Sequence, residues 1–451
     1  MSNRARVIYQ SEALYAGTVD ATAPHFTVNG SGHKTQDLAD TAATNASSEV
    51  RTGIMQLRRV QSANYSFSVN RQDVNQFGQL ARIDSVSIEP PTVTLDFSYY
   101  LTNGINEKLL GFNVSGDSSA LSNELLLGKT ASADSPVGKN FFILTTPESS
   151  DAVKNNSAES EKSVIALGNG FVSNYSIEAA VGGMPTASVT IDGLNLRSYT
   201  GTQSLVTPAV DTKYGTPIDD TFFSLPDAIS GKGESTIGDD LIWGSSDDYT
   251  NYSGNSEGFG DEGISCLRPG DISMSLGTDG RAGLFENLPD DQRALATTSE
   301  VDDTNLQINS GSAHIQSFSI DVPVSRSNIQ RLGNPYGYAK VTDFPVNISV
   351  SVSAILSDLK EGNVADLLFE QESHDLIFTM REPTQSGLGP AAMQYKIKGA
   401  RLEGESFSSS IGDNKSVDLT FTAQVGGPED EKNGIFISGS RNALTITGQF
   451  A

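Results

Sequence analysis

The chain has 451 residues, and 55 acidic against 30 basic residues give it a formal net charge of −25. Its hydrophobic content of 37%, together with 43 glycines, is ordinary for a globular protein and excludes wholesale disorder. The acidity excludes binding to DNA or anionic lipid through basic patches, because phosphate binding depends on Lys and Arg. No run of about 18 apolar residues occurs, so we expect no membrane anchor.

Residues and motifs that usually indicate catalysis or metal binding are few in this sequence. Cys266 is the single cysteine, which excludes an intrachain disulfide and a thiolate metal cluster. The four histidines never fall into an HxxxH or HExxH spacing, and neither a GxGxxG nor a GxxxxGK[ST] motif occurs. We therefore expect no catalytic residue, no metal and no cofactor, and we predict that the protein is not an enzyme.

In chain order, the first strands are marked by strict alternation of apolar and polar residues. Tyr65, Phe67 and Val69 alternate with polar residues, and a second alternating run covers 93–99. This period of two predicts half-buried antiparallel strands whose apolar face packs on a core. The polar positions of the second run are Thr94, Asp96 and Ser98. A short helix is predicted next, at 105–112, followed by an apolar strand at Asn140–Thr146.

The segment 60–101 is repeated without a gap at 315–356, with a constant offset of 255 in the numbering. Nine positions are identical in the two copies: Gln61/Gln316, Ser62/Ser317, Val69/Val324, Arg71/Arg326, Gly78/Gly333, Val86/Val341, Pro90/Pro345, Ser98/Ser353 and Leu101/Leu356. In the second copy the polar positions of the long strand are Ser349, Ser351 and Ser353.

A helix within 357–369 and a strand at Asp375–Arg381 are expected to follow in the second copy. The closing strands that begin at Ser173 match a segment that ends at Phe421, with an offset of 230 in the numbering. Two residues related by either offset occupy equivalent positions of the repeat.

One polar pair occurs at the same place in both copies, as Arg71 with Asp73 and as Arg326 with Asn328. A general acid/base role is one interpretation of this pair. An Arg just after a strand, bonded to a neighbouring turn or subunit, explains it without any substrate, and we favour this interpretation. The residues assigned to structural or interface roles are Arg71, Asp73, Gly78, Arg326, Asn328 and Gly333.

The stretch between the copies is strongly acidic. Residues 201–265 contain twelve Asp and Glu against two lysines, with frequent Gly and Ser. We predict a first domain at 1–200, this connector at 201–265 and a second domain at 266–451. Because Phe222, Phe223 and Trp243 offer apolar anchors, we expect the connector to be extended and packed over the domains.

The segment Leu57–Phe112 resembles bacteriophage tail tube proteins, and Phe171–Asn195 is similar to their closing strands. The resemblance implies a mainly β, sandwich- and barrel-forming fold with one short helix per domain. It also implies that the sheets of neighbouring subunits join into a barrel around a channel, in rings that stack. The chain resembles the kind that has two tandem homologous domains and forms trimers with pseudo-sixfold symmetry.

We therefore expect a structural protein of the virion tail that is assembled in the host cytoplasm. Its partners would be further copies of itself and other tail proteins, and genomic DNA would pass through the lumen during ejection without specific binding. The residues expected to face the lumen are Thr94, Asp96, Ser98, Ser349, Ser351 and Ser353. Two alternatives remain open: a trimeric baseplate hub or distal tail protein, and another virion binding or decoration protein.

Overall fold

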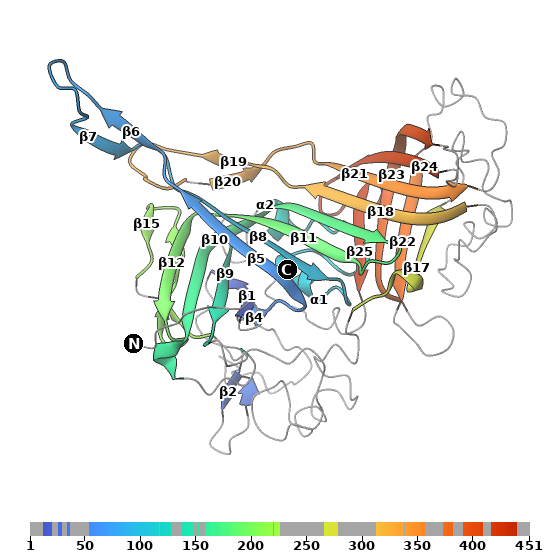
Figure 1. Ribbon diagram of the computed structural model, residues 1–451, viewed down its shortest axis with the longest axis horizontal. Helices are drawn as coiled ribbons and strands as arrows, with labels where there is room; N and C mark the ends of the chain where they lie inside the picture. Colours follow the sequence, from blue (N-terminus) through green and yellow to red (C-terminus); the bar gives the residue numbers. More distant parts are fainter. Residues whose placement is uncertain are drawn as a thin grey trace.

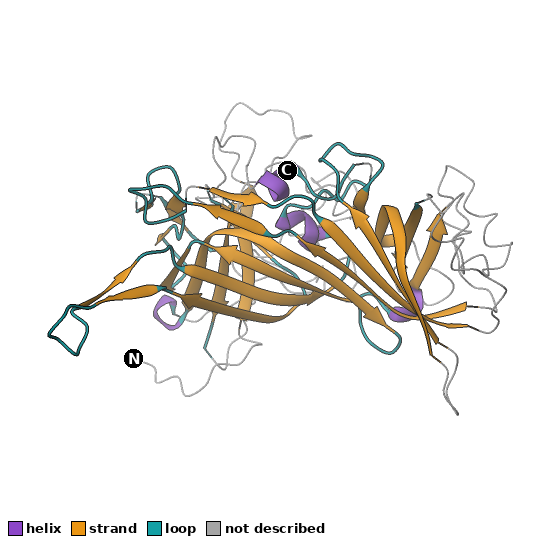
Figure 2. Ribbon diagram, turned by 90° about the horizontal axis from the view of Figure 1, so that it is seen from above, coloured by secondary structure: helices purple, strands orange, loops and turns teal. Residues whose placement is uncertain are grey.

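The chain forms a mainly β structure, as expected, in the computed structural model of Figure 1. The structure describes residues 12–19, 26–28, 34–36, 54–116, 118–127, 138–147, 152, 158–219, 221–225, 266–277, 313–337, 339–356, 373–381, 391–408 and 416–439. Most of its strands belong to one 15-stranded sheet system that includes both halves of the chain. Figure 2 shows these strands running through the length of the molecule.

Eight antiparallel strands form the central sheet. In spatial order they are β5 (Val60–Ser68), β8 (Thr92–Tyr100), β11 (Thr186–Gly193), β10 (Ser163–Ala180), β18 (Ala313–Pro323), β21 (Asn347–Leu356), β24 (Ser416–Gln424) and β23 (Ala391–Ser408). The first four come from the first half of the chain and the last four from the second half. The pairing of β10 with β18 joins the halves.

Each half adds a second layer to this sheet. In the first half it consists of β1 (Glu12–Thr18), β4 (Met55–Gln56), β9 (Lys139–Thr145) and β12 (Asn195–Thr200). In the second half it consists of β17 (Ile272–Gly277), β22 (His374–Arg381) and β25 (Gly434–Gly439). The strands expected at Asn140–Thr146 and Asp375–Arg381 are thus β9 and β22. The strand β10 pairs with β9 and β12 as β23 pairs with β22 and β25, so the order of pairing is the same in both halves.

The two long strands, β10 and β23, each pass from the second layer into the central sheet. Each contains a residue with positive φ at the passage, Asn169 with φ 52° and Gly399 with φ 73°. Asn and Gly are the residues that adopt this left-handed conformation at least cost. A Cβ at the neighbouring Gly170 would lie 2.7 Å from Ile191 and 2.8 Å from Phe141. The Gly-Asn-Gly sequence therefore forms a tightly packed strand corner.

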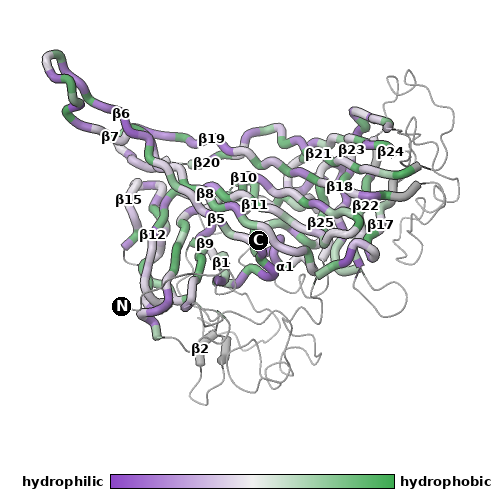
Figure 3. The backbone as a smooth tube through the Cα atoms, in the orientation of Figure 1, coloured by the Kyte–Doolittle hydropathy of each residue, from purple (hydrophilic) through white to green (hydrophobic). Residues whose placement is uncertain are grey.

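A continuous core lies between the layers and runs through both halves. Alternate residues of the central sheet fill it, including Leu95 and Phe97 of β8 and Val350 and Val352 of β21. Figure 3 shows hydrophobic and hydrophilic residues alternating along these strands. Two short helices are described, α1 (Ile105–Leu110) and α2 (Asn123–Leu127), and α1 buries its apolar side in this core. The expected helix at 105–112 is thereby confirmed, and the one within 357–369 lies outside the described residues.

The remaining elements are short hairpins and turns. Two hairpins extend the ends of β5 and β18: β6 (Arg71–Val74) with β7 (Asp84–Ser87), and β19 (Arg326–Ile329) with β20 (Ala339–Thr342). Smaller elements are β2 (Phe26–Val28), β3 (Lys34–Gln36), η2 (Glu159–Glu161) and η3 (Pro269–Asp271). The last small strands are β13 (Leu205–Val206), β14 (Val210–Asp211), β15 (Thr216–Pro217) and β16 (Phe222–Phe223).

The first part of the expected connector, residues 201–219 and 221–225, lies against the first half. Leu205, Phe223 and Leu225 are buried there with Tyr15 and Phe142, on the side of the second layer that faces away from the main core. Of the expected anchors, Phe223 is buried, Phe222 is 52% exposed, and Trp243 lies outside the described residues.

Candidate assembly interface

The face of the central sheet opposite the core carries short polar side chains on all eight strands. Cross-strand pairing places Ser62 beside Ser98, Ser188 beside Ser176, and Ser319 beside Ser351. The Ser62 and Ser98 hydroxyls are 2.7 Å apart, and Thr190 donates a hydrogen bond of 2.7 Å to Asp96. The sequence pattern predicts this polar face, and the six residues named for it all lie on it: Thr94, Asp96, Ser98, Ser349, Ser351 and Ser353.

The joint between the halves is an ordinary antiparallel strand pair. Residues 174–180 of β10 pair with 317–323 of β18, and the bond from the Val324 amide to the Ser173 carbonyl, 2.9 Å, extends the pairing. On the core side Ile177 lies opposite Ile320, and both are 0% exposed. Backbone pairing and apolar burial therefore both contribute to this joint.

The two outer edges of the central sheet are formed by β5 and by residues 404–408 of β23, each paired on one side within the described chain. These are the counterparts of β18 and β10. Both carry exposed aromatic residues on the core side: Tyr65 is 43% exposed, Phe67 63% and Phe407 47%. The residues at the equivalent positions of the joint are buried, and they are Ile320, Val322 and Ile177.

The free edges and the joint also have register shifts, or β-bulges, at equivalent positions of the repeat. The pairing of β5 with β8 shifts at Gln61, and that of β18 with β21 shifts at Gln316, the equivalent position of the repeat. The pairing of β10 with β11 shifts at Ser173, and that of β23 with β24 shifts at Glu403, again the equivalent position. Because a bulge changes the direction in which a strand runs, the free edges and the joined strands bend at equivalent positions of the repeat.

One sequence prediction is wrong in the single chain. The alternation predicts that Tyr65, Phe67 and Val69 pack on a core, but Val69 is 39% exposed and the other two are more exposed still. The alternation is that of a buried strand. These residues are exposed because β5 is an edge strand, which among the described residues pairs only with β8, so no further strand completes the core beneath it.

Arg326 fixes the second hairpin on the first half. Its guanidinium donates to the carbonyl oxygens of Val172, 3.3 Å, and Leu126, 3.3 Å, and to that of Leu125, and it lies 5.2 Å from the centre of the Phe171 ring. Burial lowers the pKa of Arg326 to about 10, with Asp192 acting in the opposite sense. Phe171 is only 3% exposed although it faces the polar side, because this hairpin covers it.

The first hairpin lies free of such contacts. It extends away from the rest of the chain at the far left of Figure 1. Asp73 pairs with Arg82 at 2.9 Å rather than with Arg71, which is exposed. Asn328 is exposed on β19. The glycines Gly78 and Gly333 both have positive φ, 88° and 83°, in the connections of the two hairpins.

A buried polar cluster missed by sequence reasoning lies beneath the joint. Glu107 of α1 accepts hydrogen bonds from Tyr99, 2.6 Å, and Tyr175, 3.0 Å, and the Tyr175 and Tyr395 hydroxyls are 2.9 Å apart. Burial raises the pKa of Glu107, and the Tyr hydroxyls lower it in part. Burial also raises the pKa values of these tyrosines, so they remain protonated donors. Nothing in the local sequence indicates the partners of this Glu.

The described residues include no group of three or more His, Cys, Asp and Glu placed to hold a metal ion. In the same ranges, no helix has the length and apolar character needed to cross a membrane. Comparison of the sequence with protein-family models and with curated proteins finds no match to either.

Proposed function

We propose that the chain is the structural subunit of a phage tail tube, in which three copies form a closed ring and rings stack around a DNA channel. The observation that carries this proposal is the match between the covered joint and the free edges. If β23 of one copy pairs with β5 of the next as β10 pairs with β18, the central sheet continues from chain to chain. Three chains would then contribute six equivalent units, which requires that the two halves are a duplicated domain.

The exposed apolar residues support such a joint. In the register of β10 and β18, Phe407 falls opposite Tyr65 and Glu405 opposite Phe67, on the core side of the sheet. Full burial of one large apolar side chain is worth about 1.5–3 kcal/mol. The two edges differ from each other, so the contact is head-to-tail, and such contacts give rings when the rotation closes.

The polar face supports the channel. On the eighth strand, β23, Arg401 lies on this face opposite Thr422. On the other seven strands, from β5 to β24, Ser, Thr, Asn, Gln, Asp and Glu occupy most of the paired positions, and none of these positions is Lys or Arg. A wall of this kind cannot release counterions from DNA by binding phosphates, so DNA would slide along it. The net charge of −25 per chain acts in the same direction.

The joint is tested by cysteine cross-linking with Ser66→Cys and Ser406→Cys in a Cys266→Ser background. Residues 66 and 406 lie at opposite edges of one chain, so a short cross-linker joins them only between copies. We expect covalent trimers on a denaturing gel and rings with a central hole in electron micrographs. The matched control is Ser98→Cys with Ser406→Cys, since Ser98 is on the same face but one strand in from the edge. Monomers at the highest soluble concentration, without cross-links, would refute the proposal.

A further inference from the structure

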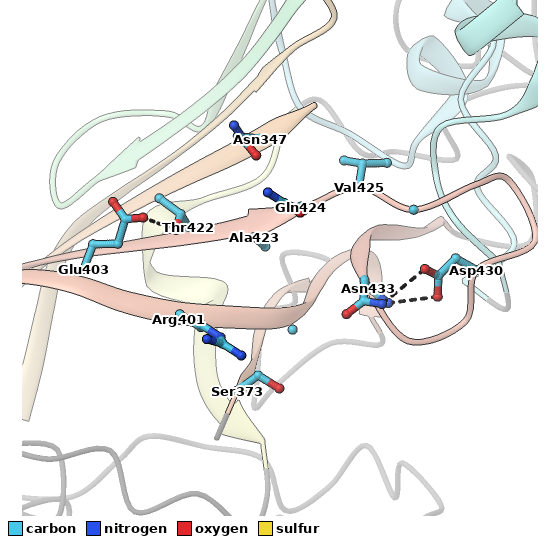
Figure 4. A pocket seen from close by; sticks show the side chains of 12 residues that line it. Asn347, Ser373, Arg401, Glu403, Thr422, Ala423, Gln424, Val425, Asp430 and Asn433 are labelled. Carbon is cyan, nitrogen blue, oxygen red and sulfur yellow. Dashed lines mark hydrogen bonds between the residues drawn. The ribbon is translucent and has the colours of Figure 1, made fainter. Parts of the chain in front are cut away.

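A pocket of about 780 Å³ lies on the second half of the chain. It is lined by Asn347, Arg401, Glu403, Thr422, Asp430 and Asn433, among others. Figure 4 shows its residues, with Glu403 bonded to Thr422 at 2.6 Å and Asn433 bonded to Asp430. The pocket contains titratable groups but, among the described residues, no convergent metal-binding cluster, and its position in the fold suggests another role.

The pocket occupies the position that the second hairpin covers on the first half. Arg401 is equivalent to Phe171 in the repeat, and Glu403 is equivalent to Ser173. Arg326 stacks over Phe171, and the Val324 amide binds the Ser173 carbonyl. The site that is filled on the first half is therefore open on the second half, where Arg401 is exposed.

We propose that the hairpin β6–β7 of a second copy docks in this pocket, with the Arg71 guanidinium bound by Glu403. This inference rests on the proposed ring, because only a neighbouring chain paired along β23 brings the hairpin there. In the register of the covered joint, the Val69 amide of the neighbour binds the Glu403 carbonyl. Arg71, two positions further on, then reaches the region of Arg401 and Leu402.

The covered site on the first half shows which charged groups meet when a hairpin docks, and these can be compared with the groups at the open pocket. There the hairpin brings two cations, Arg326 and Lys340, and Asp192 supplies the nearby carboxylate. Lys340 lies 6.0 Å from the centre of the Phe171 ring. Both cations come from the hairpin, and the carboxylate from the surface that receives it.

At the open site the charges are distributed differently. Ser85 replaces Lys340, so of these two equivalent hairpin positions only Arg71 carries a cation. Arg401 replaces Phe171 and supplies the second cation from the receiving surface. Thr422 replaces Asp192, and Glu403 supplies the carboxylate instead. The pocket also contains Asp430, so Arg71 would add a cation to a site that holds Arg401 and two carboxylates, and this charge balance favours a cationic hairpin.

The proposal is tested by charge reversal, with the concentration for half-maximal ring formation as the readout. Arg71→Glu and Glu403→Arg are each expected to raise this concentration about tenfold, because attraction becomes repulsion. The double variant is expected to return to within about twofold of the wild type. Arg82→Glu is the matched control, since it changes the charge of the same hairpin equally at a residue outside the docked contact.

A second measurement does not depend on assembly strength. Arg71→Cys in one copy and Glu403→Cys in another, both in the Cys266→Ser background, should cross-link when mixed and not when separate. Wild-type protein that forms no rings would overturn the proposed function. Rings that form equally well in all charge variants, without the mixed cross-link, would overturn only the hairpin site.

Discussion

The covered joint and the free edges differ first in whether a partner strand is present. Both have the same bulges and the same alternation, but Ile320 is fully buried at the joint while its counterpart Tyr65 is 43% exposed at the edge. The comparison teaches that burial in this protein depends on neighbouring strands rather than on the pattern alone. The same sequence pattern forms a core where the chain supplies its own neighbour and leaves an exposed edge where it does not.

The largest expected effect on stability comes from placing the same charged residue at the joint and at the edge. Ile320→Asp places an unpaired carboxylate in the core, and we expect the free energy of unfolding to fall by more than about 4 kcal/mol. Tyr65→Asp should change it by less than about 1 kcal/mol under dilute conditions, and should abolish ring formation. Urea denaturation of dilute protein measures both. Equal losses at the two positions would mean that the edge is already part of a core in the single chain.

The two hairpins provide a second comparison, of intermediate size. Arg326→Ala removes three contacts to carbonyl oxygens and exposes Phe171, so we expect a loss of about 2–3 kcal/mol. Arg71→Ala should cost less than about 0.5 kcal/mol in the same denaturation assay, because its side chain lies on an exposed hairpin. A large loss for Arg71→Ala would show that the first hairpin packs on its own chain.

The smallest expected effect concerns the buried polar cluster around Glu107, beneath the joint. Burial raises the pKa of Glu107 above its ordinary value of 4.5, so the folded protein binds more protons than the unfolded chain. Stability should therefore fall as the pH rises from about 4.5 through the raised pKa.

Glu107→Gln is neutral and retains an oxygen that accepts from Tyr99 and Tyr175. We expect it to remove this pH dependence and to raise the free energy of unfolding at neutral pH, with no gain below pH 4.5. Thermal unfolding at a series of pH values provides the measurement. An unchanged pH profile would contradict the assignment.

Much of the fold was predictable from local patterns. Alternation along 93–99 identified the strand, its buried face and its polar face, because a half-buried strand must alternate. The helix at 105–112 was predictable for a similar reason, from its apolar spacing. These features depend on residues that are close in sequence.

Features that depend on distant partners were not predictable. The exposure of Phe67 follows from its place at an edge, and the two hydrogen-bond partners of Glu107 come from separate strands, β8 and β10. The corner at Gly168–Gly170 depends on the close approach of Ile191 and Phe141, which the local sequence does not indicate. The contacts of Arg326 with α2 join segments that are far apart in the sequence, and no local pattern indicates them.

The strand corners limit which substitutions the sequence can accept. Asn169 and Gly399 hold positive φ where the long strands change layers, so a saturation library should retain few residue types at these two positions. The Ser and Thr positions of the polar face require only a small polar side chain. Ser, Thr and Asn should therefore replace one another there with little loss of stability. Related sequences would then diverge widely along the sheet face while keeping the same bends.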